Sequence, residues 1–230
     1  MKLALSWDDG TLEDRRLFDL HEKYQIPGMF FVPTRNKEGR SVLAPDTLRN
    51  AESDYVSFGG HTENHVYLTE IPPEQVDGEV FRNKQYLEDT LGHEVIHFCL
   101  PGGKYNETIL KTAFRHYQTV RTADTMNFRH NGNLLKPSIH VFPRGSKSLL
   151  GNAARNLSFP QLLYVALHLK KDYFSLIHDL LERESKKDGS TVVLWGHSWE
   201  LEEFGLWDEV EGIMRIAKDY GCIPYAEVFR

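Results

Sequence analysis

The residues best suited to chemistry stand in short motifs that each follow a predicted strand. Asp8 and Asp9 are adjacent, and neighbouring side chains of an extended segment point to opposite sides, so one can bind a metal while the other approaches from a different angle. His61 and His65 are four residues apart, which on a helical turn places both imidazoles on one face, within reach of a single cation. Two histidines and one aspartate leave coordination positions open for water and substrate. We therefore expect a catalytic metal site here.

Each of these motifs also has a structural interpretation that involves no catalysis. The segment that begins at Asp8 could form a turn that caps the next helix, with Thr11 as the N-cap and Asp14 in a capping-box position. The two histidines could lie on the surface, where this spacing is common. A shared site is favoured because both motifs follow predicted strands, whose carboxyl ends meet on one face of an α/β barrel.

Three further motifs follow predicted strands in the same way. His197 is well placed for proton transfer near neutral pH, or could simply pack among aromatic rings. Backbone N–H groups around Gly102 and Gly103 could face a developing oxyanion, although a plain strand-to-helix loop is the alternative. Arg121 and Asp124 offer a cation and a carboxylate that either orient a catalytic partner or pair with each other.

Short apolar runs alternate with longer helical patterns along the chain, which predicts parallel strands in an α/β barrel or open sheet. The segments predicted as strands are residues 2–7, 29–32, 55–58, 95–100, 119–122, 191–195 and 224–228. Those predicted as helices are residues 12–24, 73–91, 107–116, 160–186 and 207–220. Residues 129–159 have weak periodicity, which predicts an irregular loop with room for a short hairpin. No linker divides the chain, so we expect a single domain of residues 1–230.

The composition excludes several classes of function. The chain has 27 Lys and Arg against 33 Asp and Glu, a net charge of −6, and no basic stripe, which argues against nucleic acid as a partner. Cys99 and Cys222 lie far apart and indicate a reducing compartment rather than a disulfide framework. No apolar run is long enough for a membrane span or, ahead of Asp8, for a signal peptide, so we expect a cytoplasmic protein.

In type and order, the motifs resemble those of the polysaccharide deacetylase (NodB-homology) family, over nearly the whole length from Ser6 to His197. Residues 6–10, Ser-Trp-Asp-Asp-Gly, are similar to the family's Thr-Phe-Asp-Asp-Gly motif. Residues 61–65, His-Thr-Glu-Asn-His, match its His-Ser/Thr-x-x-His metal motif. Residues 194–197, Leu-Trp-Gly-His, resemble its late Leu-x-x-His motif.

This resemblance implies a distorted (β/α) barrel of about seven parallel strands that binds one divalent ion, Zn²⁺ or a relative such as Co, Ni, Mn or Fe. The implied ligands are Asp9, His61 and His65. Asp8 would be the general base that takes a proton from the attacking water, and His197 the acid that protonates the leaving amine. The implied activity is removal of an acetyl group from an N-acetylated sugar or oligosaccharide.

The substrate side of the implied site would include a backbone N–H near Gly102 that helps to hold the oxyanion. Gly103, Tyr105 and Trp199 complete that expected set, and Asp124 is the further candidate for orienting a catalytic group.

The chain departs from the family's third motif, which often reads Arg-x-Pro-x-Gly with an aromatic residue before the last glycine. Cys99 stands where the arginine is expected, and Gly102 where the aromatic residue is expected. We therefore hypothesise that Arg121, on the following strand, reaches Asp8 in place of the missing arginine. Two alternatives stay open: an esterase or non-sugar amide hydrolase on the same scaffold, or an inactive carbohydrate-binding barrel.

Overall fold

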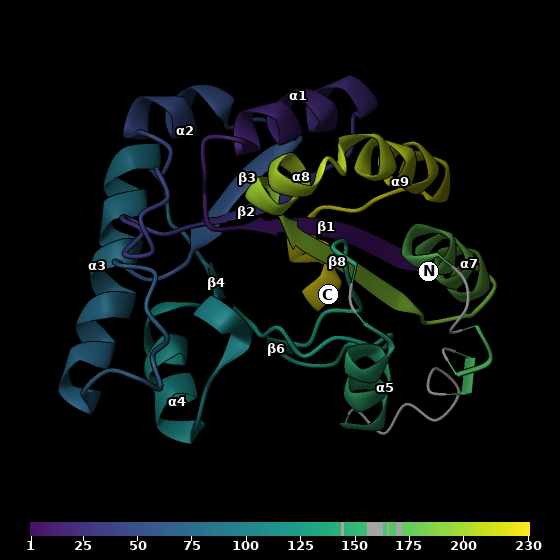
Figure 1. The fold of residues 1–230 in the computed structure, drawn as a ribbon. Coiled ribbons are helices and arrows are strands. Elements are labelled where there is room, and N and C mark those ends of the chain that lie inside the picture. Colours follow the sequence, from purple (N-terminus) through teal and green to yellow (C-terminus); the bar gives the residue numbers. More distant parts are fainter. Residues whose placement is uncertain (144, 156–162, 165, 169–171) are drawn as a thin grey trace.

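The computed structural model describes residues 1–143, 145–155, 163–164, 166–168 and 172–230. It contains one eight-stranded sheet in the order β6-β5-β4-β3-β2-β1-β8-β7, in which every pair of neighbours is parallel (Figure 1). The strands are β1 (Lys2–Asp8), β2 (Gly28–Val32), β3 (Val56–Gly60), β4 (His97–Cys99), β5 (Thr119–Arg121), β6 (Leu134–Leu135), β7 (Ile139–His140) and β8 (Thr191–His197).

The two edge strands of this sheet show that it curls into a distorted barrel. β6 and β7 lie at opposite ends of the strand order, yet only residues 136–138 separate them in the chain. Four Cα–Cα steps span at most about 14 Å, so the two edges must approach each other. The predicted (β/α) barrel is thereby confirmed, with eight strands instead of about seven.

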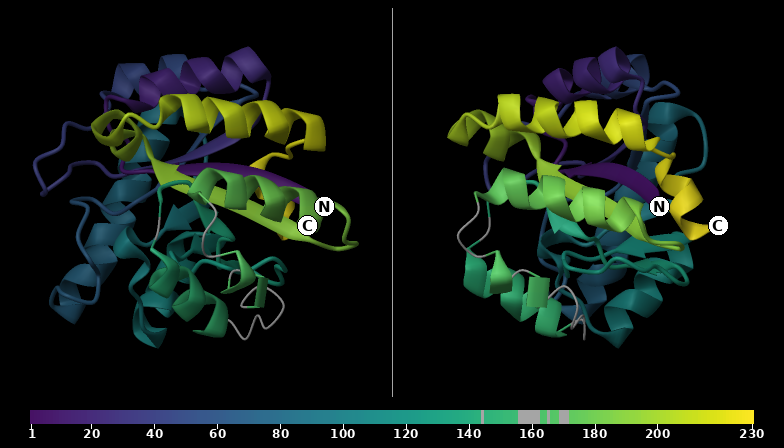
Figure 2. Two further views of the ribbon diagram at one scale, coloured as in Figure 1. Left: turned by 45° about the vertical axis from the view of Figure 1, so that its right-hand side comes forward. Right: turned by 90° about the vertical axis from the view of Figure 1, so that its right-hand side faces the viewer.

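Helices pack around the outside of the sheet (Figure 2). They are α1 (Asp14–Tyr24), α2 (Pro45–Ala51), α3 (Pro73–Leu91), α4 (Glu107–His116), α5 (Ser146–Arg155), α7 (Tyr173–Ser185), α8 (Ser198–Phe204) and α9 (Trp207–Tyr220), with the short 3₁₀ turns η1 (Pro101–Gly103) and η2 (Tyr225–Phe229). Three predicted helices, 73–91, 107–116 and 207–220, are confirmed with the same bounds. None of the described helices is long and apolar enough to cross a membrane.

Three predictions about secondary structure are wrong. The helix expected over 160–186 is not continuous, because Asp172 is extended and caps α7 by accepting hydrogen bonds from the backbone of Phe174 and Ser175; part of that range lies outside the described residues. The segment 129–159 holds no hairpin between β6 and β7, since both strands run in the same direction at opposite sheet edges, and α5 follows them.

The strand expected over 224–228 is instead the 3₁₀ turn η2. The preceding segment pairs with β1 only at the bridge between Leu3 and Cys222, where the N–H of Ile223 donates to the carbonyl of Leu3 at 2.9 Å, and Pro224 has no N–H to continue the ladder. η2 therefore closes the barrel at the amino ends of the strands, where Lys2 Nζ donates to the carbonyl of Glu227 at 3.0 Å. Both views in Figure 2 place this yellow segment near the N-terminus.

Alternation along the strands divides the core into an outer layer under the helices and a small barrel interior. In β1, Leu3, Leu5 and Trp7 belong to the outer layer, whereas Ala4 faces inward. The interior cluster comprises Ala4, Met29, Phe31, Cys99, Leu135, Val193, Tyr225 and Val228. By the same alternation, Asp8 faces inward at the carboxyl end of β1. The fold thus places a charged residue directly above the apolar interior cluster of the barrel.

His21 of α1 is a buried structural histidine that ties this helix to β1. The indole N–H of Trp7 can only donate, so His21 Nε2 accepts its hydrogen bond at 2.8 Å, and Nδ1–H donates to the carbonyl of Ile26 at 2.6 Å. Gly28 packs directly against the imidazole, leaving no room for a Cβ. Burial lowers the pKa of His21 to about 4.

We expect the free energy of unfolding to fall as the pH falls from 6.5 towards 4. An unfolded histidine binds a proton near pH 6.5 but folded His21 only near pH 4, so the unfolded chain is favoured in between. Roughly 2.5 pKa units correspond to about 3 kcal/mol. Urea denaturation at several pH values measures this, with His97, whose pKa is also about 4, adding to the effect.

His21→Gln keeps a donor and an acceptor but cannot be protonated, so its stability should depend less on pH than that of the wild type. The exposed His93 provides a matched control, since His93→Gln should leave the pH dependence nearly unchanged. An equal pH dependence in wild type and His21→Gln would contradict the assignment.

Candidate metal centre and active site

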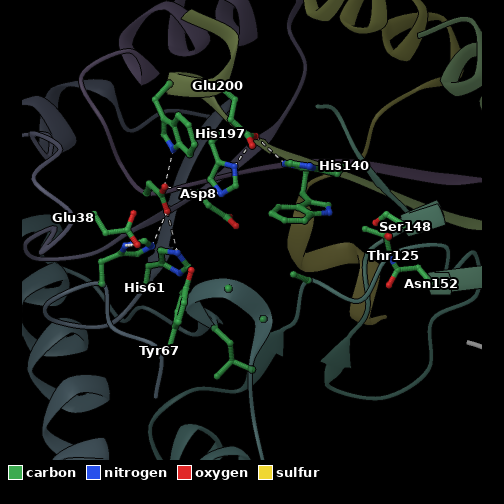
Figure 3. A pocket seen from close by; sticks show the side chains of 18 residues that line it. Asp8, Glu38, His61, Tyr67, Thr125, His140, Ser148, Asn152, His197 and Glu200 are labelled. Carbon is green, nitrogen blue, oxygen red and sulfur yellow. Dashed lines mark hydrogen bonds and ion pairs between the residues drawn. The ribbon is translucent and has the colours of Figure 1, made fainter. Parts of the chain in front are cut away.

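A cavity of about 400 Å³ opens at the carboxyl ends of the strands, the face on which barrel enzymes assemble their sites (Figure 3). Its walls come from the residues that follow β1, β3, β4, β5 and β8, together with α5 and the loop after β2. The lining residues are Asp8, Asp9, Glu38, His61, His65, Tyr67, Leu100, Gly102, Gly103, Ala123, Thr125, His140, Ser148, Asn152, Trp195, His197, Trp199 and Glu200.

The three predicted metal ligands meet in this cavity. Asp9 Oδ1 lies 3.4 Å from His61 Nε2 and 2.9 Å from His65 Nε2, and all three residues are buried. His61 Nδ1 lies 2.8 Å from the carbonyl oxygen of Cys99, so its N–H donates there and the Nε2 lone pair is left for a ligand bond. Asp9 Oδ1 accepts no hydrogen bond of normal geometry from the described residues. This set fits a divalent ion.

The route by which these residues meet differs from the one predicted. Residues 61–65 form an irregular loop and not a helical turn, with positive φ at Thr62 (68°) and His65 (52°). The preceding glycines end β3 and are required by close packing rather than by a bend. A Cβ on Gly59 would approach the ring of Phe31 to 2.7 Å, and one on Gly60 would collide with Tyr117.

Asp9 is aimed at the histidines by a tight turn at the end of β1. Asp9 and Gly10 have φ values of 78° and 58°, so the chain leaves the strand in the left-handed region. A Cβ on Gly10 would approach Val32 Cγ1 to 2.6 Å, which only glycine avoids. Burial raises the pKa of Asp9, but His197, His61 and His65 outweigh that effect and hold the pKa well below its usual range.

Asp8 points to the other side and pairs with Arg121, as hypothesised from the sequence. Nη2 of Arg121 contacts both carboxylate oxygens of Asp8, and both side chains are almost fully buried. Since β5 and β1 are separated by three strands in the sheet, this ion pair crosses the barrel interior. Cys99, on β4, fits beside it: Nη2 lies 2.9 Å from Cys99 Sγ. The small thiol leaves the space through which Arg121 reaches Asp8.

The guanidinium of Arg121 is also held between aromatic rings. Its Cζ lies 5.2 Å from the ring centroid of Phe31 and 4.9 Å from that of Trp195. Nη1 donates to the carbonyl of Thr122 at 3.2 Å. These contacts fix the position of the guanidinium, and therefore the direction from which it binds the carboxylate of Asp8.

His197 lies on the Asp9 side of the cavity, with its Nε2 4.0 Å from Asp9 Oδ2. Its Nδ1 is 2.8 Å from Glu200 Oε2, and the same oxygen is 3.0 Å from His140 Nε2 (Figure 3). Burial opposes the charged imidazolium, but Asp9, Glu200 and Asp8 outweigh it and raise the pKa of His197 to about 9. Burial likewise opposes the Glu200 carboxylate, yet the two histidines lower its pKa to about 2.

Sequence reasoning missed Glu200 and His140. Glu200 lies three residues after His197, a spacing that brings side chains together at the start of a helix such as α8. This signal was therefore available. His140 gave none, because it belongs to the segment predicted as an irregular loop, and it reaches the site only through the pairing of β7 with β8.

Trp199 lies in the cavity wall, as expected, and also contacts the candidate metal ligand Asp9. Its indole N–H donates to Asp9 Oδ2 at 2.8 Å, and the guanidinium of Arg40 stacks 3.6 Å above its ring. Oδ2 is thereby occupied while Oδ1 faces the two histidines. Glu38, from the same loop as Arg40, lies 3.6 Å from His65 Nδ1 and was also missed from the sequence.

Gly102 and Gly103 line the cavity as expected, but their surroundings differ from a simple oxyanion loop. The N–H of Gly103 already donates to the carbonyl of Leu100 at 2.8 Å. A Cβ on Gly102 (φ 61°) would approach the ring of Tyr67 to 2.7 Å. Tyr67, which sequence reasoning missed, thus supplies an aromatic ring where the third motif lacks one.

Two expected residues lie elsewhere. Asp124 forms ion pairs with Lys136 at 3.7 Å and Arg155 at 3.4 Å, and it is not among the residues that line the cavity. Tyr105 lies next to Asp124 and does not line the cavity either. Both come after strands whose ends contribute other residues to the cavity wall. Their role in the site stays a prediction.

Two more groups of described residues have a geometry that could hold a cation. Asp8, His61 and Cys99 form one, but the guanidinium of Arg121 already neutralises it. His140, His197 and Glu200 form the other, in which Glu200 already faces two imidazole nitrogens. Asp9, His61 and His65 are therefore the best supported metal ligands.

Comparison with known proteins agrees with this arrangement. The polysaccharide deacetylase family profile matches residues 1–120, just over half of the chain. A peptidoglycan-N-acetylglucosamine deacetylase of Bacillus cereus is 27% identical over 121 residues, which cover 51% of this chain and 54% of that protein. The chain spans about half the length of the curated relatives it matches.

Solved structures extend the likeness across the fold. The Streptococcus pyogenes deacetylase PplD, in complex with acetate, is 25% identical with a TM-score of 0.54, over 65% of this chain and 69% of that one. A family 4 acetyl xylan esterase from Clostridium thermocellum, in complex with cobalt, is 14% identical with a TM-score of 0.58, over 99% of this chain and 90% of that one, and so shares the fold. By its sequence profile and its fold, this chain belongs to the polysaccharide deacetylase family.

Proposed function

We propose that this protein uses one divalent metal ion to hydrolyse the acetyl group of an N-acetylated sugar or oligosaccharide. The observation that carries the proposal is the pairing of Asp8 with Arg121 beside the Asp9, His61 and His65 set. It restores, from another strand, the arginine that the third motif lacks. A held base next to a ligand set is the arrangement that hydrolysis of an acyl group requires.

The proposed reaction assigns parts to the ligand set, to Asp8 with Arg121, and to His197. A divalent ion held by Asp9, His61 and His65 would supply a Lewis acid that polarises the acetyl carbonyl. Asp8, fixed by Arg121, takes a proton from the attacking water. His197, whose Nε2 lies on the Asp9 side of the ring, gives a proton to the leaving nitrogen.

The proposal of a sugar substrate is supported by Tyr67 and by three small polar side chains. Tyr67 presents an aromatic ring on one wall, suited to stacking against a sugar, and Thr125, Ser148 and Asn152 line the opposite part of the cavity (Figure 3). A volume of about 400 Å³ is in the range of small-molecule sites. This combination supports a soluble N-acetylated sugar or short oligosaccharide.

Two other functions were open from the sequence, and both can be separated from this one. An inactive carbohydrate-binding barrel is disfavoured because the residues proposed as base and acid lie at one cavity, and an arginine pairs with the proposed base. An esterase would use the same attack on an acyl carbon, so only the substrate distinguishes it.

We expect acetate release to be faster from N-acetylated sugars than from O-acetylated ones. The assay compares N,N′-diacetylchitobiose, N-acetylglucosamine, O-acetylated xylo-oligosaccharides and acetamide at equal concentrations, with acetate measured enzymatically. A kcat/KM higher for the O-acetylated sugars would replace the amide hydrolase with an esterase. Absence of acetate from every substrate would favour the inactive barrel.

We expect the purified protein to bind about one divalent ion per chain, and His61→Ala to lose it, because two remaining ligands hold a cation poorly. Elemental analysis after dialysis measures the metal content directly, without reference to activity. The exposed His93 offers the matched control: His93→Ala should retain the metal. Stoichiometric metal in His61→Ala would show that the ligands are assigned wrongly.

We expect Arg121→Met to lower kcat/KM by about 100-fold or more, because Asp8 loses the group that orients it. Breaking a buried ion pair by removing one partner also destabilises a fold by about 3–5 kcal/mol, so a thermal melt must accompany the kinetics. Arg115→Met, on the exposed face of α4, is the control. An unchanged kcat/KM in a folded Arg121→Met protein would refute the role of this arginine.

A further inference from the structure

One carboxylate oxygen in the site is shared by two histidines. Glu200 Oε2 lies 2.8 Å from His197 Nδ1 and 3.0 Å from His140 Nε2, and dashed lines in Figure 3 mark both contacts. His140 and Glu200 are buried, and only 16% of the His197 side chain is exposed. The three residues come from β7, β8 and α8, so this cluster joins the last strand pair to the helix that follows it.

The geometry determines which nitrogen of His197 can react. A carboxylate only accepts, so Nδ1 of His197 carries the hydrogen that bonds to Glu200. The other nitrogen, Nε2, is then the one on the side of Asp9, at 4.0 Å from its Oδ2. Glu200 therefore selects the tautomer and the ring orientation in which Nε2 points towards the ligand set.

His140 holds Glu200 in that position. Its ring stacks on Trp195 with centroids 4.1 Å apart and planes inclined by 27°, and its carbonyl accepts a hydrogen bond from the hydroxyl of Tyr173 at 2.7 Å. The pairing of His140 with Trp195 in the sheet fixes the backbone as well. A rigid imidazole thus fixes the carboxylate, and the carboxylate fixes His197.

A second metal ion at this cluster is the main alternative, since His140, His197 and Glu200 could act as ligands. However, His197 Nδ1 donates a hydrogen bond to this oxygen, and His140 Nε2 lies 3.0 Å from it, at ion-pair distance. A metal would instead need that oxygen and both nitrogens to direct lone pairs at a common point. One hydrogen bond and one ion pair to the same carboxylate explain the contacts without an added group.

We propose that Glu200 and His140 are positioning residues for the general acid His197, a role that rests on the proposed hydrolysis. As the bond between the acetyl carbon and the leaving atom breaks, its electron pair goes to that atom, which takes the proton from His197 Nε2. The Nδ1–H of His197 stays bonded to Glu200 throughout, and the proton of the attacking water goes to Asp8. The positioning of His197 by Glu200 and His140 is called the relay below. It affects the rate of hydrolysis only when the leaving atom needs a proton.

That condition gives a test through the leaving group. The probes are 4-nitrophenyl acetate, whose phenolate departs without a proton, phenyl acetate, whose leaving group is poorer, and N,N′-diacetylchitobiose. For the metal-loaded protein, Glu200→Gln should lower kcat for diacetylchitobiose about 100-fold or more, lower it less for phenyl acetate, and change it less than about 3-fold for 4-nitrophenyl acetate. A structural defect would lower all three alike, and that result, or no loss on any probe, would overturn the proposal.

Glu203→Gln is the matched control, because it makes the same change on the same helix at an exposed position outside the cavity lining. It should behave as the wild type with every probe. Metal content and thermal melts are measured for each variant. If Glu200→Gln does not fold, His140→Gln takes its place, with an expected loss of about 10-fold confined to the poorer leaving groups.

A double-mutant cycle separates action through His197 from any other action. Adding Glu200→Gln to His197→Ala should change kcat for diacetylchitobiose by less than about 2-fold, since the group that Glu200 positions is already gone. A further large loss would overturn the relay.

The failure of the relay and that of the proposed function give different results. If the wild-type protein cleaves the aryl acetates but not diacetylchitobiose, the proposed sugar substrate is wrong. The relay is then tested by comparing the effect of Glu200→Gln on phenyl acetate with its effect on 4-nitrophenyl acetate. Wild-type protein that cleaves none of the probes overturns both.

Discussion

The buried ion pair between Asp8 and Arg121 is the interaction on which the rest of the site depends. Two charges inside a barrel lose most of their hydration, and their attraction offsets that loss only when the geometry is good. Here Arg121 contacts both oxygens of Asp8 and lies between the rings of Phe31 and Trp195. Because the pair spans from β1 to β5, it joins opposite walls of the sheet. It also fixes Asp8, and therefore the turn that directs its neighbour Asp9 to the histidines.

The substitution of Cys99 for the expected arginine becomes understandable from this geometry. An arginine on β4 would extend into the space that the guanidinium of Arg121 now fills, so only one of the two positions can supply the cation. Burial raises the pKa of the Cys99 thiol, even though Arg121 lies beside it, and a neutral thiol adds no charge to compete with Asp8. Gly102 shows a similar exchange, because the absence of a side chain there leaves room for the ring of Tyr67. In both places a departure from the family's motif is matched by a residue from another segment.

How much of the structure could be predicted from the sequence depends on whether the interactions involved are local or long-range. Helices 73–91, 107–116 and 207–220 were predictable because prolines, glycines and amphipathic spacing act locally. The metal set and the Asp8–Arg121 pair were predictable because parallel strands bring their carboxyl ends together. By contrast, η2 was mistaken for a strand, since only the tertiary structure shows that the contact of this segment with β1 ends at the bridge between Leu3 and Cys222. His140, Glu38 and Tyr67 reach the site from loops or short strands whose course only the tertiary structure determines, and Asp124 shares a strand end with Arg121 yet does not line the cavity.

The charges of the site explain why its carboxylates can lie so close together. Asp8 is neutralised by the permanent charge of Arg121, and Glu200 faces the imidazoles of His197 and His140. Asp9 faces two imidazoles that carry a full charge only when they are protonated, and its Oδ1 accepts no regular hydrogen bond from the described residues. A buried carboxylate of this kind favours a cation. A divalent ion at Asp9 would complete this pattern, in which each carboxylate has its own positive partner. The residues proposed as base, as metal ligand and as support of the acid would then not compete for the same positive group.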